Sequence, residues 1–80
     1  MLAFTRHARN RMRLFHIRED EVLATWTRPE ATCRAGKLIR CVRRFPRRFH
    51  GRPLVVAVDP TTTPPTVVTA YPLKRLWRPR

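Results

Sequence analysis

The stretch Arg52-Pro-Leu-Val-Val-Ala-Val-Asp59 carries the strongest structural signal in the sequence. Its uninterrupted apolar run, Leu54 to Val58, is typical of a central, well-covered strand. Pro53 breaks the chain before the run, and Asp59-Pro60 begins a loop after it. The sequence therefore predicts a sheet with this segment buried at its middle.

Three further segments predict the other strands of this sheet. Residues 32–34 and 37–45 precede the central run, with a turn at Gly36 between them, and residues 66–71 follow a threonine-rich loop. Side chains of a strand alternate between its two faces. The last strand is therefore expected to place Val68 and Ala70 on one face, and Val67, Thr69 and Tyr71 on the other.

The first third of the chain has the periodicity of two helices. The first is predicted over 5–15, with Thr5 as its N-cap, and it carries His7 and Arg11 at the border of its apolar face. The second is predicted over about 18–27, where the acidic residues of the first turn complement the helix dipole. Its buried stripe is expected to consist of Val22, Leu23 and Trp26.

Together these segments predict an α+β fold, in which two N-terminal helices precede a sheet of three to four mainly antiparallel strands. A chain of 80 residues is long enough for one domain, which we expect to extend over 1–80. Its basic tail begins at about Pro72, and Leu73, Leu76 and Trp77 are expected to dock back onto the domain.

The charge balance points to an anionic partner. The chain has 18 Lys and Arg residues against 5 Asp and Glu residues, a formal net charge of +13. Such a surface repels itself unless an acidic protein, a membrane surface or a nucleic acid neutralises it, and nucleic acid is the commonest of these partners. No apolar run approaches the ~18 residues that span a bilayer. We therefore expect a cytoplasmic protein with no membrane partner.

Few residue types are available for chemistry. The chain has no serine, its only glycines are Gly36 and Gly51, and its cysteines, Cys33 and Cys41, fit no zinc spacing. We therefore expect no serine triad, no glycine-rich phosphate loop, no metal and no cofactor. Histidine, arginine, threonine and one tyrosine remain. They suffice for metal-independent RNA cleavage, because the substrate supplies its 2′-hydroxyl as nucleophile and the protein only moves protons and stabilises the phosphorane.

The segment Thr5-Arg-His-Ala-Arg-Asn-Arg-Met12 resembles the H-A-x-x-R-M opening of a small bacterial family of unknown function. Members of that family continue with an acidic helix, a Pro-Glu step, a Gly turn and a closing V-V-T-x-Y strand. The matching segments here are Glu19 to Glu21, Pro29-Glu30, Gly36 and Val67-Val-Thr-Ala-Tyr71, so that the resemblance covers roughly 4–72. It implies an RNase-like toxin domain of the barnase–EndoU–colicin–RelE superfold, with RNA as substrate and an acidic antitoxin as partner.

The resemblance also implies a cleft with named roles. His7 would be the general acid or base, and Arg11 and Arg40 would hold the scissile phosphate, because the arginine fork meets two phosphate oxygens. Tyr71 would stack on a base or donate a hydrogen bond, and Thr69 would position the backbone. For each of these residues a purely structural role is the alternative.

A second cluster of arginines is the expected RNA-binding surface. A basic loop with interleaved aromatic side chains grips the phosphate backbone and stacks bases. The residues of this surface are Arg43, Arg44, Phe45, Arg47, Arg48 and Phe49. Arg43 and Arg44 are also alternatives to Arg40 in the cleft, since a slip of one residue in the register changes the face of a strand. The alternative for the whole segment is a solvated basic loop.

Two functions without catalysis compete with the endoribonuclease. One is a basic RNA- or ribosome-binding module, and the other is a structural protein of a large ribonucleoprotein. Both predict RNA binding that survives loss of His7. The nuclease predicts that loss of His7 or Arg11 abolishes cleavage and leaves the fold intact.

Overall fold

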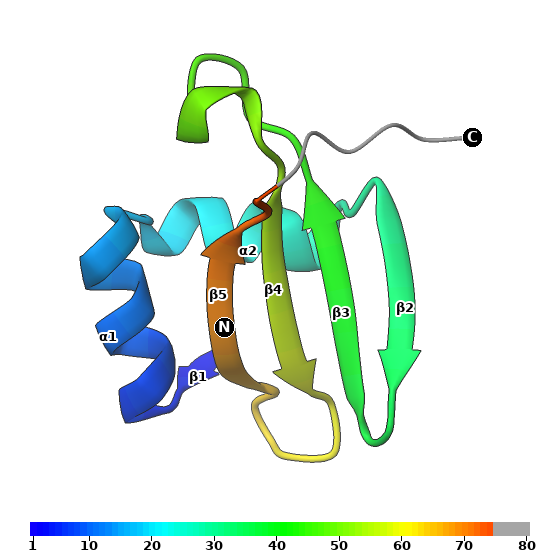
Figure 1. Cartoon of the computed structure of the whole chain (residues 1–80). Coiled ribbons are helices and arrows are strands. Elements are labelled where there is room, and N and C mark those ends of the chain that lie inside the picture. Colours follow the sequence, from blue (N-terminus) through cyan, green and yellow to red (C-terminus); the bar gives the residue numbers. More distant parts are fainter. Residues whose placement is uncertain (75–80) are drawn as a thin grey trace.

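The apolar run predicted as the central strand lies at the centre of the sheet. The computed structural model describes residues 1–74, and in it β4 (Leu54–Asp59) is the third of five strands, in the order β1-β5-β4-β3-β2. Every residue of β4 before Asp59 is buried. Figure 1 shows β4 flanked by β5 and β3, and the prediction for this segment is confirmed.

Four strands surround β4 in a mixed sheet. β3 (Leu38–Arg43) pairs antiparallel with β4 and with β2 (Ala31–Ala35), while β5 (Thr66–Pro72) pairs antiparallel with the other side of β4. Gly36 takes a φ of 62° in the turn between β2 and β3, a conformation that glycine adopts without steric cost. β1 (Ala3–Phe4) adds a parallel partner at the outer side of β5.

The predicted number of three to four strands is wrong, because the sheet has five. The additional strand, β1, has 2 residues and so no alternation that a sequence pattern can reveal. It is placed by tertiary hydrogen bonds: the Ala3 N–H donates to the Pro65 carbonyl at 2.9 Å, and the Thr5 N–H donates to the Val67 carbonyl at 3.0 Å. The α+β class, with both helices ahead of the four longer strands, is as predicted.

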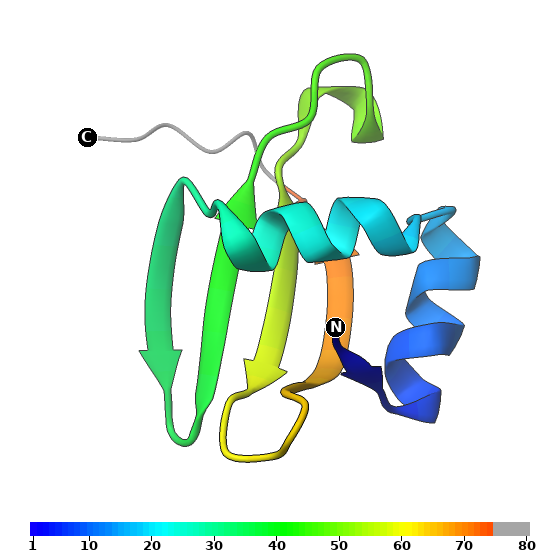
Figure 2. The same ribbon diagram turned by 180° about the vertical axis from the view of Figure 1, so that it is seen from behind.

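Both predicted helices are present. α1 (Arg6–Phe15) begins at Thr5, whose hydroxyl accepts the Ala8 N–H, and ends at His16 in the left-handed conformation. α2 (Glu19–Thr27) follows. α1 packs against β5, and α2 crosses one face of the sheet over β4 and β3 (Figure 2). Neither is long and apolar enough to cross a membrane.

The core lies between the helices and the sheet. Its buried side chains are Ala8, Met12, Ile17, Val22, Leu54, Val56, Val58, Val67 and Ala70. The predicted stripe of α2 is confirmed for Val22, and Trp26 packs against the core, but Leu23 is wrong because it is 41% exposed. Glu21 and Thr25 are buried instead. At about 100° per residue, Glu21 and Thr25 lie on the same side of Val22 and share the inward face with it. Leu23 lies on the other side of Val22 and is turned away from the sheet.

A β-bulge in β5 changes the face of Val67. The register pairs Val58 with Val67 and Ala57 with Thr69, which leaves Val68 without an opposite residue in β4. Val67 is therefore fully buried in the core, while Thr69 lies on the other face of the sheet. The prediction that these two side chains share a face is wrong, because the extra residue shifts the alternation by one.

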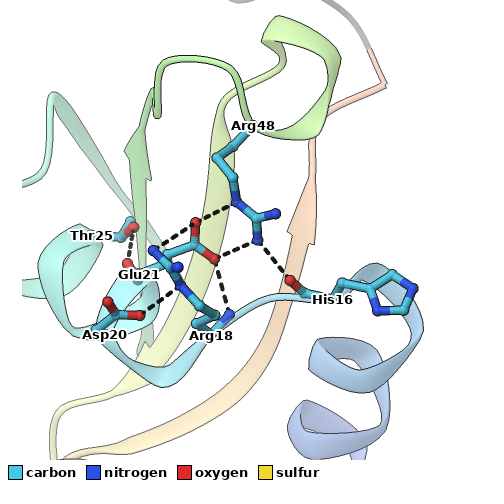
Figure 3. Close-up of polar contacts among 6 residues, drawn as sticks. All are labelled: His16, Arg18, Asp20, Glu21, Thr25 and Arg48. Carbon is cyan, nitrogen blue, oxygen red and sulfur yellow. Dashed lines mark hydrogen bonds and ion pairs between the residues drawn. The ribbon is translucent and has the colours of Figure 1, made fainter.

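A buried carboxylate joins both helices to the loop before β4 (Figure 3). Glu21 is 2% exposed, and it accepts hydrogen bonds from Arg48 Nε at 2.7 Å and Arg48 Nη2 at 2.8 Å. The same Nη2 donates to the His16 carbonyl at the end of α1, and the Arg18 N–H donates to Glu21. Hydrogen bonding to Arg48 holds the pKa of Glu21 below its ordinary value although burial acts in the opposite direction.

The described chain ends beside the start of β4. The Leu73 N–H donates to the Pro53 carbonyl at 2.9 Å, and the Leu73 side chain is half-buried. The expected docking of Leu76 and Trp77 lies outside the described residues.

Thr5→Val is expected to destabilise the domain by about 1–2 kcal/mol. The hydroxyl of Thr5 caps α1 and also donates to the carbonyl of the bulge residue Val68 at 3.0 Å, and valine keeps the shape but loses both contacts. Urea unfolding measures the change. The control is Thr27→Val, which removes a hydroxyl from the exposed end of α2 and is expected to change stability by less than about 0.5 kcal/mol. Equal effects of the two variants would contradict this role of Thr5.

Glu21→Gln is expected to destabilise the domain by about 2–3 kcal/mol at pH 7, because the Arg48 guanidinium then loses its charged partner. The lowered pKa of Glu21 sets the sign of the pH dependence. Its contribution is fully present above the ordinary value of 4.5 and is lost as the pH falls through the lowered pKa. The difference between wild type and variant therefore shrinks in acid, as urea unfolding between pH 7 and pH 3 measures.

The control for this variant is Glu19→Gln. Glu19 pairs with Arg9 at the surface, with both side chains more than half exposed, so its removal is expected to cost less than about 1 kcal/mol. A difference between wild type and Glu21→Gln that stays constant down to pH 3 would contradict the proposed titration.

Candidate functional site

A groove of about 820 Å³ lies between α1 and the C-terminal half of β5. It opens on the face of the sheet opposite α2. In Figure 1, α2 lies behind the strands, so this face is turned toward the viewer. Its lining residues come from α1, from β5 and from the segments next to the ends of β4 and β5, and they are His7, Arg11, Phe15, Arg52, Thr69, Tyr71, Pro72, Leu73 and Lys74. The groove therefore brings together His7, Arg11, Thr69 and Tyr71, which the sequence places far apart.

The helix and the strand present their groove residues at matching intervals. His7, Arg11 and Phe15 follow one another at four-residue steps, which advance about 6 Å along a helix. Thr69 and Tyr71 are two residues apart on β5, a step of about 6.7 Å. Because these repeats are nearly equal, the two rows of side chains run side by side along the groove.

The bulge at Val68 decides which side chains of β5 enter the groove. Without the extra residue, Thr69 and Val67 would lie on one face of the strand. In the structure Val67 fills the core, and Thr69 and Tyr71 are half-buried on the groove side. Thr5 supports this arrangement, since its hydroxyl donates to the Val68 carbonyl.

The groove is cationic. His7, Arg11, Arg52 and Lys74 are exposed at its walls, and none of the described lining residues is acidic. No carboxylate among residues 1–74 forms an ion pair with Arg11 or Arg52. Phe15 and Tyr71 add aromatic surface between the charges. An anion with a planar group fits this combination, because the guanidinium groups bind oxygen atoms and the rings offer stacking surface.

The structure does not bring Arg40 to this groove. Arg40 pairs with Ala57, which pairs with Thr69, so two strand spacings of about 4.8 Å each separate Arg40 from Thr69 on the same face. Arg40 is exposed and is not among the described lining residues. Arg52 occupies the position by the groove instead.

Arg52 lines the groove but is not among the site residues predicted from the sequence, although the pairing of the last two strands indicates its position. An antiparallel pair places the start of one strand beside the end of the other. Leu54 is accordingly opposite Pro72, so Arg52, just before β4, lies beside the chain that leaves β5, and both Arg52 and Tyr71 line the groove. A hairpin of the last two strands therefore predicts that Arg52 lies near the groove.

The structure divides the expected RNA-binding segment into inward and outward side chains. Arg48 is bound to Glu21, and Phe45 and Phe49 pack against the core. Arg43 Nη1 donates to the Arg28 carbonyl at 2.7 Å. Most of this segment is therefore engaged in the fold.

The remaining two arginines of the segment are exposed. Arg44 pairs with Glu30, whose pKa is lowered, first of all by the hydrogen bond from the Arg44 N–H. Arg47 takes a φ of 61° in the loop. Neither side chain lines the groove described above. Arg44 and Arg47 therefore do not extend the groove surface that contains His7 and Arg11.

Among the described residues, no three His, Cys, Asp or Glu side chains lie close enough together to hold a metal ion. Cys33 is exposed and Cys41 is buried, and both are free thiols. Burial raises the pKa of the Cys41 thiol. The two cysteines lie on opposite faces of the sheet, since Cys33 pairs with Arg40 and Cys41 pairs with Val56 on the core side.

Comparison with known proteins identifies a family but no activity. The chain shows no significant similarity to curated proteins or to solved structures. The profile of a family described as a domain of unknown function, DUF4258, matches residues 4–72. This match includes α1, β5 and Arg52, and so nearly all of the groove. The chain therefore belongs to the DUF4258 family.

Proposed function

We propose that this domain is a metal-independent endoribonuclease, acting as the toxin of a toxin–antitoxin pair. One observation carries the proposal: the groove places an exposed histidine, His7, beside an arginine that has no carboxylate partner in residues 1–74, Arg11, and beside the hydroxyl groups of Thr69 and Tyr71. This set suits the transfer of protons next to a bound phosphate.

The reaction needs two proton transfers and one displacement at phosphorus. His7 takes the proton of the 2′-hydroxyl, whose oxygen attacks the adjacent phosphorus and forms a bond to it. The bond to the 5′-oxygen of the next nucleotide breaks, and that oxygen leaves with a proton from the Tyr71 hydroxyl or from the imidazolium. The products are a 2′,3′-cyclic phosphate and a 5′-hydroxyl, so atoms and charges balance without water or metal.

Two arginines suit the binding of the phosphate. Arg11 stands between His7 and Phe15 on the groove side of α1, where its planar fork meets two non-bridging oxygens. Arg52 lines the same groove and takes the phosphate-binding role that the resemblance implies for Arg40. Charge on the phosphorane rises in the transition state, so these contacts strengthen as the reaction proceeds. Thr69 positions the backbone of the bound strand.

The architecture is compatible with the RNase-toxin superfold, in which helices precede an antiparallel sheet. Here α1 and α2 also precede the four longer strands, and the groove lies on the face opposite α2. The charge of +13 suits both an RNA substrate and an acidic protein that would neutralise the toxin.

A non-catalytic RNA- or ribosome-binding module is the second candidate. It is favoured by the composition of the groove, because His7 is the only histidine among its described lining residues and the arginines alone would suffice for binding. The two functions differ in what His7 does, so the test removes that side chain.

His7→Ala is expected to lower RNA cleavage about 10²–10⁴-fold, the usual contribution of a general acid or base. Arg11→Ala is expected to lower it about 10²–10³-fold, and Arg11→Lys is expected to recover little of this, because an ammonium group lacks the planar fork. Cleavage of end-labelled RNA in the presence of EDTA measures the rates. The expected product carries a 2′,3′-cyclic phosphate.

Arg13→Ala is the matched control, because it removes the same charge from the exposed side of α1 outside the groove. It is expected to keep its cleavage rate within about threefold, since exposed charges away from the site are screened by salt. Thermal unfolding confirms that each variant is folded. RNA that binds the wild-type protein but stays intact at high protein concentration would exclude the nuclease and support the binding module.

A further inference from the structure

A second, smaller groove opens beside the first. It has a volume of about 370 Å³ and lies between the end of α1 and the loop that contains η1 (Phe49–Gly51). Leu14 and His16 line it from the side of α1, and Phe49 and His50 line it from the loop. Both histidines are exposed, and none of the described lining residues is acidic.

The two grooves are adjacent. Phe15, Arg52 and Pro72 line both of them, so Arg52 stands where the two grooves meet. Arg52 is exposed and has no ion pair within residues 1–74. Arg48 also lines the second groove, but its guanidinium is already bound to Glu21. Arg52 is therefore the arginine available at the junction.

Two contacts hold the ring of Phe49 in place at the wall of the second groove. The rings of Phe49 and Phe45 meet edge to face, with centroids 6.5 Å apart and planes at 84°. The Arg48 guanidinium lies over the Phe49 ring at 4.7 Å from its centroid. These contacts hold Phe49 in one orientation beside His50. Aromatic rings at a groove wall offer a stacking surface to a planar base, because every base has a face that stacks on aromatic groups.

The backbone around this surface is held in an unusual conformation. Arg47, Phe49 and His50 have φ values of 61°, 55° and 54°, the left-handed region that residues other than glycine rarely adopt. The bond between Arg48 and Glu21 fastens the loop in this shape. A strained backbone that is held by such a contact is typical of binding sites. The fixed loop also orders the rings of Phe49 and His50 before a ligand arrives.

Resting on the proposed function, we infer that the second groove is a subsite for the nucleotide that flanks the cleaved bond in a single-stranded RNA. Arg52 binds the phosphate at the junction of the grooves, and the rings of Phe49 and His50 hold the next base. The substrate class is accordingly an unpaired strand that fills both grooves. A duplex is excluded as substrate, since its bases stay stacked on one another and do not splay into a side groove.

Binding of short 2′-O-methyl RNA strands, two to six nucleotides long, tests the subsite. The methyl group removes the nucleophile, so fluorescence anisotropy measures affinity without cleavage. We expect the affinity of the wild-type protein to rise about tenfold in one step, at the length that first places a base in the second groove. His50→Asn and Arg52→Gln are expected to reduce this step at least about threefold, and asparagine is chosen because it tolerates a left-handed backbone. Arg52→Gln is also expected to lower the slope of log K against log salt by about 0.7.

Arg34→Gln is the matched control, because it removes the same charge from β2, outside both grooves, and it is expected to keep the step. Thermal unfolding verifies that the variants are folded. An affinity that rises smoothly with length, a step that persists in both variants, or no binding at any length overturns the subsite.

This binding measurement, combined with the cleavage assay on end-labelled RNA, separates this inference from the proposed function. Cleavage of RNA together with a smooth length dependence removes the subsite and leaves the nuclease standing. A step in affinity without any cleavage supports the subsite and leaves an RNA-binding module in place of the enzyme.

Discussion

The buried carboxylate of Glu21 is the contact on which the arrangement of the helices and the η1 loop depends. It receives two hydrogen bonds from Arg48 and one from the backbone of Arg18, and Arg48 also binds the last turn of α1 through the His16 carbonyl. An uncompensated charge at this depth would be strongly destabilising. The buried Glu21 carboxylate therefore needs Arg48 beside it, which fixes the position of the η1 loop. The loop leads directly into Arg52 and β4.

The few acidic residues are all used within the fold. Each binds a neighbour: Glu19 pairs with Arg9, Asp20 with Arg18, Glu21 with Arg48, Glu30 with Arg44, and Asp59 accepts hydrogen bonds from Thr61. None of them lines the groove between α1 and β5. The positive charge of the protein is thus left unopposed where His7 and Arg11 meet β5, and such a field raises the rate at which anionic substrates arrive.

The features that the sequence predicts correctly depend on residues close together in the chain. The central strand, the cap at Thr5 and the placement of His7 and Arg11 on one side of α1 are local patterns, and the structure has them. That α1 and β5 share a groove was implied by a resemblance and not by periodicity. The same resemblance implies a place there for Arg40, but the pairing of three strands puts Arg40 too far away. The inward direction of Arg48 depends on a carboxylate 27 positions away in the chain, which no local pattern reveals.

Composition and local periodicity were enough to predict the order of the two helices and the four longer strands, the buried middle of the sheet and the cationic character of the protein, because these properties depend on residues close together in the chain. Only the tertiary structure decided that β1 joins the sheet, that a bulge turns Val67 away from Thr69, and that Arg52 reaches the groove. These features arise from hydrogen bonds and packing between segments distant in the chain. Their energies depend on which segments become neighbours, and folding alone settles that.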